Sequence, residues 1–162
     1  MATDPGAQYE PIIQGAAKAF DLDPNILRGM AQTESVNFNP DVISGKKKSP
    51  AGAIGIMQFM PDTAKRFNVD PTDPKQAIFA SAQYLRENLD KFGGDYTKAV
   101  AGYNWGENRD TFNQKDWVKK LPDETYAYKQ GGGAATGGAP VTGNQKWQSA
   151  LTDFENQGGG RK

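Results

Sequence analysis

The chain has 162 residues, and its nineteen basic and nineteen acidic side chains give a formal net charge of zero. A neutral chain has no overall field that collects nucleic acid, so no nucleic-acid partner is expected. The absence of cysteine and histidine excludes cysteine nucleophiles, disulfides, serine–histidine triads and the usual zinc sites. Acid–base chemistry must therefore use Asp, Glu, Tyr or Lys. We expect no metal and no cofactor.

The N-terminus lacks the features of a secretory signal. Asp4 and Pro5 stand where a basic segment would be, and no apolar run follows. No stretch approaches the about 18 to 20 apolar residues that span a bilayer. The sequence therefore predicts neither a signal peptide nor a membrane span.

The first part of the chain predicts two helices. Residues Tyr9–Phe20 place apolar side chains on one face at helical spacing. Asp23 followed by Pro24 is typical of a helix start, with an N-cap residue and then a proline in the first turn. We expect this second helix to run to about Glu34.

Helix-start signals recur as far as residue 128. Asp73 and Pro74 repeat the cap-and-proline pattern and open the longest predicted helix, which ends at Gly93 and Gly94. A single apolar stripe is expected on this helix, formed by Ile78, Ala82, Leu85, Leu89 and Phe92. Further predicted helices span residues 61–67, 96–103, 117–121 and 122–128. Residues 53–59 are the best candidate for a small sheet, although glycines interrupt them. The sequence predicts an all-α or mostly α domain.

Glycine gathers at the C-terminal end of the chain. Nine of the nineteen glycines lie in residues 129–162, which is typical of a linker. We therefore expect one domain over residues 1–130 and a glycine-rich tail over 131–162. Within this tail, residues Gln145–Asn156 carry Trp147, Leu151 and Phe154 at helical spacing. They predict a short helix that docks on the domain.

One carboxylate stands at a chemically unusual position. The apolar face of the second helix consists of Ile26, Leu27, Met30 and Ala31. Glu34 occupies the next step of this pattern and the end of the helix, where the helix dipole opposes a negative charge. Both effects predict a raised pKa, which suits a general acid. The alternative is a glutamate that turns to solvent before an exit loop begins at Ser35.

Four separated blocks carry a resemblance to a known family. They are Glu34-Ser35, residues 52–58 with Met60-Pro61, Gly102-Tyr103-Asn104, and Leu121-Pro122 with Glu124-Thr125. In this order they resemble the soluble lytic transglycosylase family of the lysozyme superfamily over about residues 9–130. The resemblance implies a lysozyme-like helical fold. It also implies cleavage of the β-1,4 bond between N-acetylmuramic acid and N-acetylglucosamine in peptidoglycan, leaving a 1,6-anhydro end.

The resemblance also implies roles for individual residues. Glu34 would act as general acid and then as general base, with the Tyr103 hydroxyl nearby to orient it. The substrate-binding residues would be Ser35, Met57, Gln58, Asn104, Glu124 and Tyr128. Three of these residues have structural alternatives. Ser35 could cap a turn, Glu124 could place a charge at a helix start, and Tyr128 could pack in the core. The chain departs from the family pattern at Gly102, at Trp105, and in a longer loop containing Lys46–Lys48.

Two other functions remain open from the sequence. One is a lysozyme-like muramidase that uses water, and the other is an idle glycan-binding or structural module of a phage or secretion assembly. The expected partner is the glycan strand of peptidoglycan in the periplasmic or extracellular cell wall. Without a signal peptide, we expect delivery by a phage particle, by lysis or by a secretion apparatus. The chain would then be a bacteriophage protein or part of a longer phage or secretion-system protein.

Overall fold

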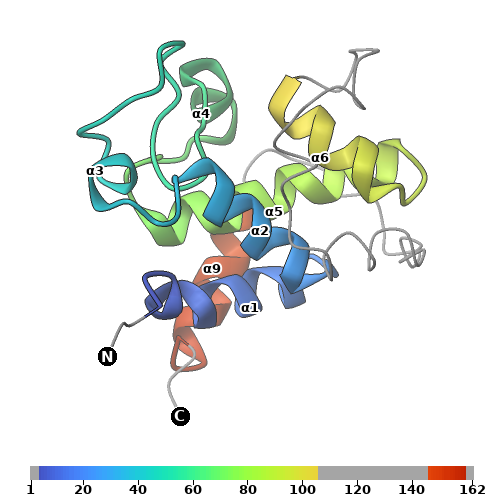
Figure 1. Ribbon diagram of the computed structural model, residues 1–162. Helices are drawn as coiled ribbons and strands as arrows, with labels where there is room; N and C mark the ends of the chain where they lie inside the picture. Colours follow the sequence, from blue (N-terminus) through green and yellow to red (C-terminus); the bar gives the residue numbers. More distant parts are fainter. Residues whose placement is uncertain (1–3, 106–145, 160–162) are drawn as a thin grey trace.

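The computed structural model describes residues 4–105 and 146–159. Within these residues the chain is helical, and its only β-pairing is a single bridge between Ile54 and Phe59. The elements in chain order are η1 (Ala7–Tyr9), α1 (Glu10–Ala19), α2 (Pro24–Glu34), α3 (Pro40–Ile43), α4 (Pro61–Phe67), α5 (Pro74–Lys91), α6 (Tyr96–Trp105) and α9 (Lys146–Asn156) (Figure 1). This confirms the predicted mostly α fold. The helices predicted at 117–121 and 122–128 lie outside the described residues.

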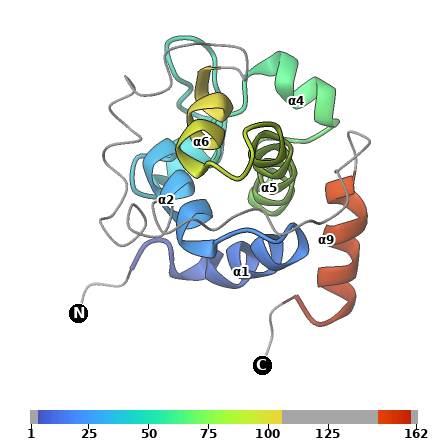
Figure 2. The ribbon, with the colours of Figure 1, turned by 90° about the vertical axis from the view of Figure 1, so that its right-hand side faces the viewer.

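Helix α5 forms the centre of the fold. Figure 2 looks nearly along its axis and shows α1, α2, α6 and α9 arranged around it. The sequence predicted one apolar stripe on this helix, but its polar residues Ser81, Gln83, Arg86 and Asn88 are buried as well. A helix with neighbours on several sides buries more than one face, so the single-stripe prediction was too narrow.

Three helices begin with the same capping pattern. Asp23, Asn39 and Asp73 each accept a hydrogen bond from the backbone N–H two residues later, at 2.9, 2.9 and 3.0 Å, and each precedes a proline. The bond satisfies an N–H that has no partner inside the helix. The starts of α2 and α5 were predicted from this pattern. Helix α3 was missed, although the pair Asn39-Pro40 carries the same signal.

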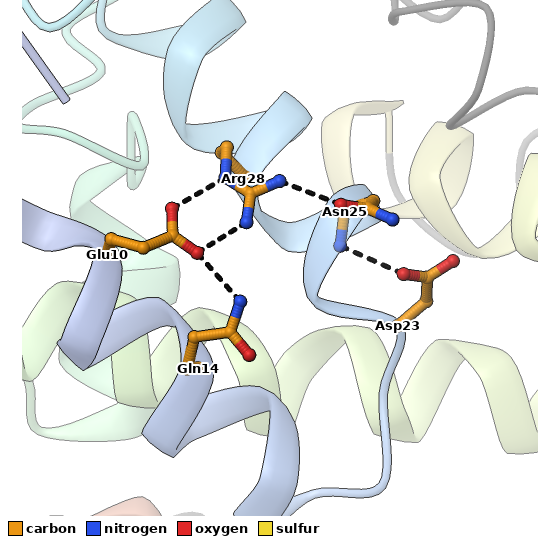
Figure 3. A network of polar contacts seen from close by, with 5 residues as sticks. All are labelled: Glu10, Gln14, Asp23, Asn25 and Arg28. Atoms are coloured by element: carbon orange, nitrogen blue, oxygen red, sulfur yellow. Dashed lines mark hydrogen bonds and ion pairs between the residues drawn. The ribbon is translucent and has the colours of Figure 1, made fainter. Parts of the chain in front are cut away.

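A polar network joins α1 to α2 (Figure 3). The Glu10 carboxylate accepts from the guanidinium of Arg28 through Nε, at 2.6 Å, and through Nη2. Arg28 Nη1 also donates to Asn25 at 2.8 Å, and Gln14 donates to Glu10 at 2.7 Å. The bidentate contact between Arg28 and Glu10 is the geometry that guanidinium and carboxylate groups favour. It fixes α2 against α1, and thereby the direction in which α2 carries its last residue.

Helix α9 occupies the place where the sequence predicted a short helix. Trp147 and Leu151 are buried in the same core as α1 and α5, and Phe154 packs against that core. A Cβ at Gly15 of α1 would come within 2.4 Å of the Phe154 ring, so a side chain at this position would displace the ring. The boundary expected at residue 130 stays a prediction. Within residues 4–105 and 146–159, no helix is long and apolar enough to cross a membrane.

Candidate active site

Glu34 is the last residue of α2. The apolar face that leads to it, Ile26, Leu27, Met30 and Ala31, is fully buried, as the sequence predicted. Glu34 itself is half-buried. The carboxylate thus lies at the border between the core and the surface, at the negative end of the helix dipole.

Ser35 shapes the turn that follows. Its hydroxyl donates to the Ala31 carbonyl at 2.6 Å and accepts from the Phe38 N–H at 2.8 Å. Ser35 is 0% exposed. These bonds favour the turn-capping alternative over direct substrate binding, because both hydrogen bonds of the buried hydroxyl serve the backbone.

The turn after Ser35 is left-handed over three residues. Val36, Asn37 and Phe38 have φ values of 54°, 58° and 59°. This conformation costs roughly 1–2 kcal/mol for each residue with a side chain. The Phe38 ring holds the turn in place, since it is buried and stacks on Tyr9 with ring centroids 5.7 Å apart. Strained backbone that the surroundings enforce is frequent at functional sites.

The segment from Gly52 to Phe59 contains the second block of the family resemblance. A Cβ at Gly55, where φ is 86°, would lie 1.8 Å from the Pro71 carbonyl oxygen. Only glycine permits that approach. Gln58 has a φ of 52°, and its side-chain amide donates to the Gly55 carbonyl at 2.9 Å. Gln58 is half-buried, so its side chain stays a candidate for substrate binding.

Met57 contacts the rest of the fold through both its side chain and its backbone. Its side chain is fully buried in the core, which leaves little of it for contact with a substrate. Its carbonyl accepts a 2.8 Å hydrogen bond from the Tyr103 hydroxyl. The role of Met57 in substrate binding stays a prediction.

Tyr103 comes from α6 and contacts the other segments through its ring. Its ring centroid lies 6.2 Å from that of Phe59 and 5.1 Å from that of Tyr84. Tyr84 is buried in α5 and is not among the residues that the sequence predicted for the site. An aromatic residue in the middle of a core helix gives no signal of a nearby site.

Electrostatics connects Tyr103 with Glu34. Burial raises the pKa of the Tyr103 phenol well above its ordinary 10.0, and the negative charge of Glu34 and then Tyr84 push it in the same direction. The charge of Glu34 therefore acts on this phenol. Tyr103 stays protonated at neutral pH and keeps its hydrogen for the Met57 carbonyl. The hydrogen bond joins α6 to the segment from Gly52 to Phe59.

The remaining predicted residues are not placed. Asn104 belongs to α6, but its side chain lies outside the described part, as do Glu124 and Tyr128. Among the described residues there is no group of three or more Asp and Glu side chains that could hold a metal ion.

The family follows from a comparison with family models. The model described as "Transglycosylase SLT domain" matches residues 11–133. This chain belongs to the transglycosylase SLT domain family. The match includes all four blocks on which the resemblance rests and ends before α9 begins.

Two phage proteins are similar to this SLT domain. The sequence is 36% identical to the transglycosylase of Enterobacteria phage PRD1, over 91% of this chain and 56% of that protein. It is 38% identical to the peptidoglycan transglycosylase gp16 of Escherichia phage T7, over 64% of this chain and 8% of that protein. The chain thus spans about half of the first relative and a small part of the second.

A solved structure supports the fold. The chain is similar to an inactive mutant of the lytic transglycosylase Slt from Pseudomonas aeruginosa, with a TM-score of 0.53 and 21% identity. The similarity covers 98% of this chain and 25% of that one. It agrees with the lysozyme-like helical architecture expected from the sequence.

Proposed function

We propose that this SLT domain is a peptidoglycan lytic transglycosylase. It cleaves the β-1,4 bond between N-acetylmuramic acid and N-acetylglucosamine without water and leaves a 1,6-anhydro end. The observation that carries the proposal is the 2.8 Å hydrogen bond from the Tyr103 hydroxyl to the Met57 carbonyl, which joins the third block of the family resemblance to the second. The charge of Glu34, in the first block, acts on the same phenol. The names of the two phage relatives support the same activity.

Glu34 carries both proton transfers in this mechanism. As an acid it gives its proton to the glycosidic oxygen, and the bond from that oxygen to C1 of the muramic sugar breaks. As a carboxylate it then takes the proton of the C6 hydroxyl of the same sugar, whose oxygen bonds to C1. Glu34 ends protonated, as it began, and no water enters. The intramolecular attack is favoured by proximity, and one carboxylate suffices where most glycosidases use two.

Tyr103 positions the groups around Glu34. Its neutral phenol adds no second negative charge beside the carboxylate, and its hydrogen bond ties α6 to the Met57 backbone. Ser35 holds the turn that follows Glu34, because its buried hydroxyl bonds to the backbone of Ala31 and Phe38. We assign these two residues to positioning.

Substrate binding is assigned to polar and aromatic side chains around this centre. Gln58 offers an amide with a donor and an acceptor, which suits the N-acetyl groups of the glycan. Asn104, Glu124 and Tyr128 are proposed as further contacts on the basis of the family resemblance.

Analysis of the products tests the proposal. Purified peptidoglycan is digested with the chain, and the fragments are identified by mass spectrometry. The proposal expects fragments that end in 1,6-anhydro-muramic acid. Reducing muramic ends would overturn it in favour of a hydrolytic muramidase. A folded protein that gives no glycan product would overturn it in favour of a binding or structural module.

The phage relatives support a proposal on delivery. We propose that the domain acts on the bacterial cell wall as part of a phage protein carried by the particle. Mass spectrometry of purified particles of a phage that encodes this sequence is expected to detect its peptides. Peptides found in the lysate and absent from the particles would contradict delivery by the particle, whatever the outcome of the product analysis.

A further inference from the structure

The first turn of α9 makes two buried hydrogen bonds to the rest of the domain. The indole Nε1–H of Trp147 donates to the Phe67 carbonyl at 2.8 Å, and its backbone N–H donates to Gln83 Oε1 at 2.8 Å. Trp147 is 2% exposed. Buried bonds of this kind are costly to break, because the abandoned partner finds no water. Helix α9 is therefore anchored at Phe67, the last residue of α4, and on α5.

Phe67 belongs to a closed ring of four aromatic side chains, here called the four-ring cluster. Its members are Phe59, Phe67, Tyr84 and Tyr103. Ring centroids lie 6.3 Å apart for Phe59–Phe67 and 5.3 Å for Phe67–Tyr84. They lie 5.1 Å apart for Tyr84–Tyr103 and 6.2 Å for Phe59–Tyr103. The Tyr103 ring therefore packs against Phe59 and Tyr84, and each of these two rings also packs against Phe67.

A series of polar side-chain contacts also links Trp147 to the rings of Phe67 and Tyr84. Gln83 Nε2 donates to Glu87 Oε2 at 3.0 Å, and Arg66 donates to Glu87 Oε1 at 2.6 Å. The Arg66 guanidinium lies 4.6 Å from the centroid of Phe67 and 5.3 Å from that of Tyr84. Such contacts are attractive and fix the ring planes. Trp147 therefore reaches the four-ring cluster by two routes.

The other end of α9 has a different environment. The Phe154 ring lies 5.4 Å from that of Phe79 and packs against Gly15 of α1. Glu155 forms a 3.7 Å ion pair with Lys75 between exposed side chains. Neither Phe79 nor Gly15 belongs to the four-ring cluster. The two ends of the helix can therefore be tested separately.

We propose that Trp147, in the first turn of α9, is a positioning residue for Tyr103. Trp147 fixes the Phe67 backbone and, through the four-ring cluster, holds the Tyr103 phenol at the Met57 carbonyl. The family match ends at residue 133, so this function lies in a segment that the match does not reach. The proposal rests on the proposed function, because the effect of Trp147 is measured as a change in the rate of the transglycosylase reaction.

The test compares two variants of the full chain. Trp147→Phe removes the indole donor but keeps an aromatic ring and the backbone bond to Gln83. Phe154→Leu loosens the far end of the same helix. For Trp147→Phe we expect kcat for the release of anhydro ends from soluble glycan strands to fall about five- to tenfold with KM within about twofold, because small displacements of catalytic groups are costly. Phe154→Leu is expected to keep the wild-type kcat at a comparable loss of thermal stability.

Equal kcat values for the two variants would overturn the proposal. If Trp147→Phe does not fold, Glu87→Gln is used instead, since it weakens the series of polar contacts at the surface, and it is expected to lower kcat in the same way. A wild-type protein that releases no glycan product would overturn the proposed function alone. The ring signals of Tyr103 in a tyrosine-labelled NMR sample then decide the proposal. They are expected to shift in Trp147→Phe but not in Phe154→Leu, and unshifted signals would overturn it.

Discussion

The hydroxyl of Tyr103 donates a 2.8 Å hydrogen bond to the backbone carbonyl of Met57, 46 residues earlier in the chain. This bond joins α6 to the segment that carries Gln58. The charge of Glu34 acts on the same phenol. A single side chain therefore connects the proposed acid with the backbone of the proposed substrate-binding segment.

Replacing Tyr103 by Phe is expected to lower both activity and stability. The ring stays in the four-ring cluster, but the Met57 carbonyl loses its donor, which costs about 1–3 kcal/mol for a buried acceptor. The resulting displacement near Glu34 is expected to lower kcat by about 10- to 100-fold. Urea unfolding and the rate of release of anhydro ends measure the two effects.

Tyr96 offers a matched control for this change. It is a buried tyrosine whose hydroxyl accepts a 2.9 Å bond from the Asp23 backbone N–H, and the charges that act on it are those of Asp23, Arg86 and Asp21. Tyr96→Phe is expected to lose stability and retain kcat. An equal loss of kcat in both variants would contradict a specific role of Tyr103.

The two glycines of the segment before Gln58 are expected to respond differently to alanine. Both have a positive φ, 91° for Gly52 and 86° for Gly55. A Cβ at Gly52 meets nothing within 4 Å, whereas one at Gly55 would lie 1.8 Å from the Pro71 carbonyl oxygen. Gly52→Ala is thus expected to cost only the left-handed strain, about 1–2 kcal/mol. Gly55→Ala is expected to displace the segment and to abolish activity. Similar thermal unfolding and activity in the two variants would contradict this account.

Replacing Val36 by Asn is expected to stabilise the protein. Val36 is left-handed with a φ of 54° and is 67% exposed, so the change removes strain and little packing. Asn tolerates this conformation better than a β-branched residue, and we expect a gain of roughly 1 kcal/mol. The free energy of unfolding from urea titration measures it. Thr33→Asn, in the last turn of α2, is expected to give no gain. Destabilisation by Val36→Asn would show that the valine side chain has an unrecognised contact.

The pair Glu10–Arg28 is expected to make folding sensitive to acid. The hydrogen bond from Arg28 lowers the pKa of Glu10 below its ordinary 4.5 in the folded state. The contribution of the pair is therefore complete above pH 4.5 and is lost as the pH falls through the folded pKa. Because both side chains are about one-third exposed, we expect only about 0.5–1 kcal/mol. Glu10→Gln should reduce stability at pH 7 and remove this part of the acid dependence. An unchanged slope of stability against pH would contradict it.

The sequence was a good guide to the helices, because their signals are local. Asp23 and Asp73 cap helices that begin with the following proline, and Gly93 follows closely on the end of α5. These patterns need only neighbouring residues. The burial of Gln83 and Asn88 in α5 was not predictable in this way, since it depends on helices that pack on α5 from several directions.

The candidate site was predictable in part for the same reason. Glu34 could be identified from its position on α2, and Tyr103 from the family resemblance. The roles of Ser35 and Met57 depend on tertiary contacts, namely a buried hydroxyl and a carbonyl that faces another helix. The four-ring cluster joins side chains from separate parts of the chain, and no spacing in the sequence indicates that such rings meet.

The most direct test of the account is the replacement of Glu34 by Gln, which keeps the size of the side chain and removes its proton chemistry. Wild-type and variant proteins digest the same peptidoglycan, and mass spectrometry quantifies 1,6-anhydro-muramic ends. The account predicts a loss of about 10²- to 10⁴-fold in their rate of release, with unfolding stability maintained. A folded Glu34→Gln variant that releases these ends within a few-fold of the wild-type rate would contradict it.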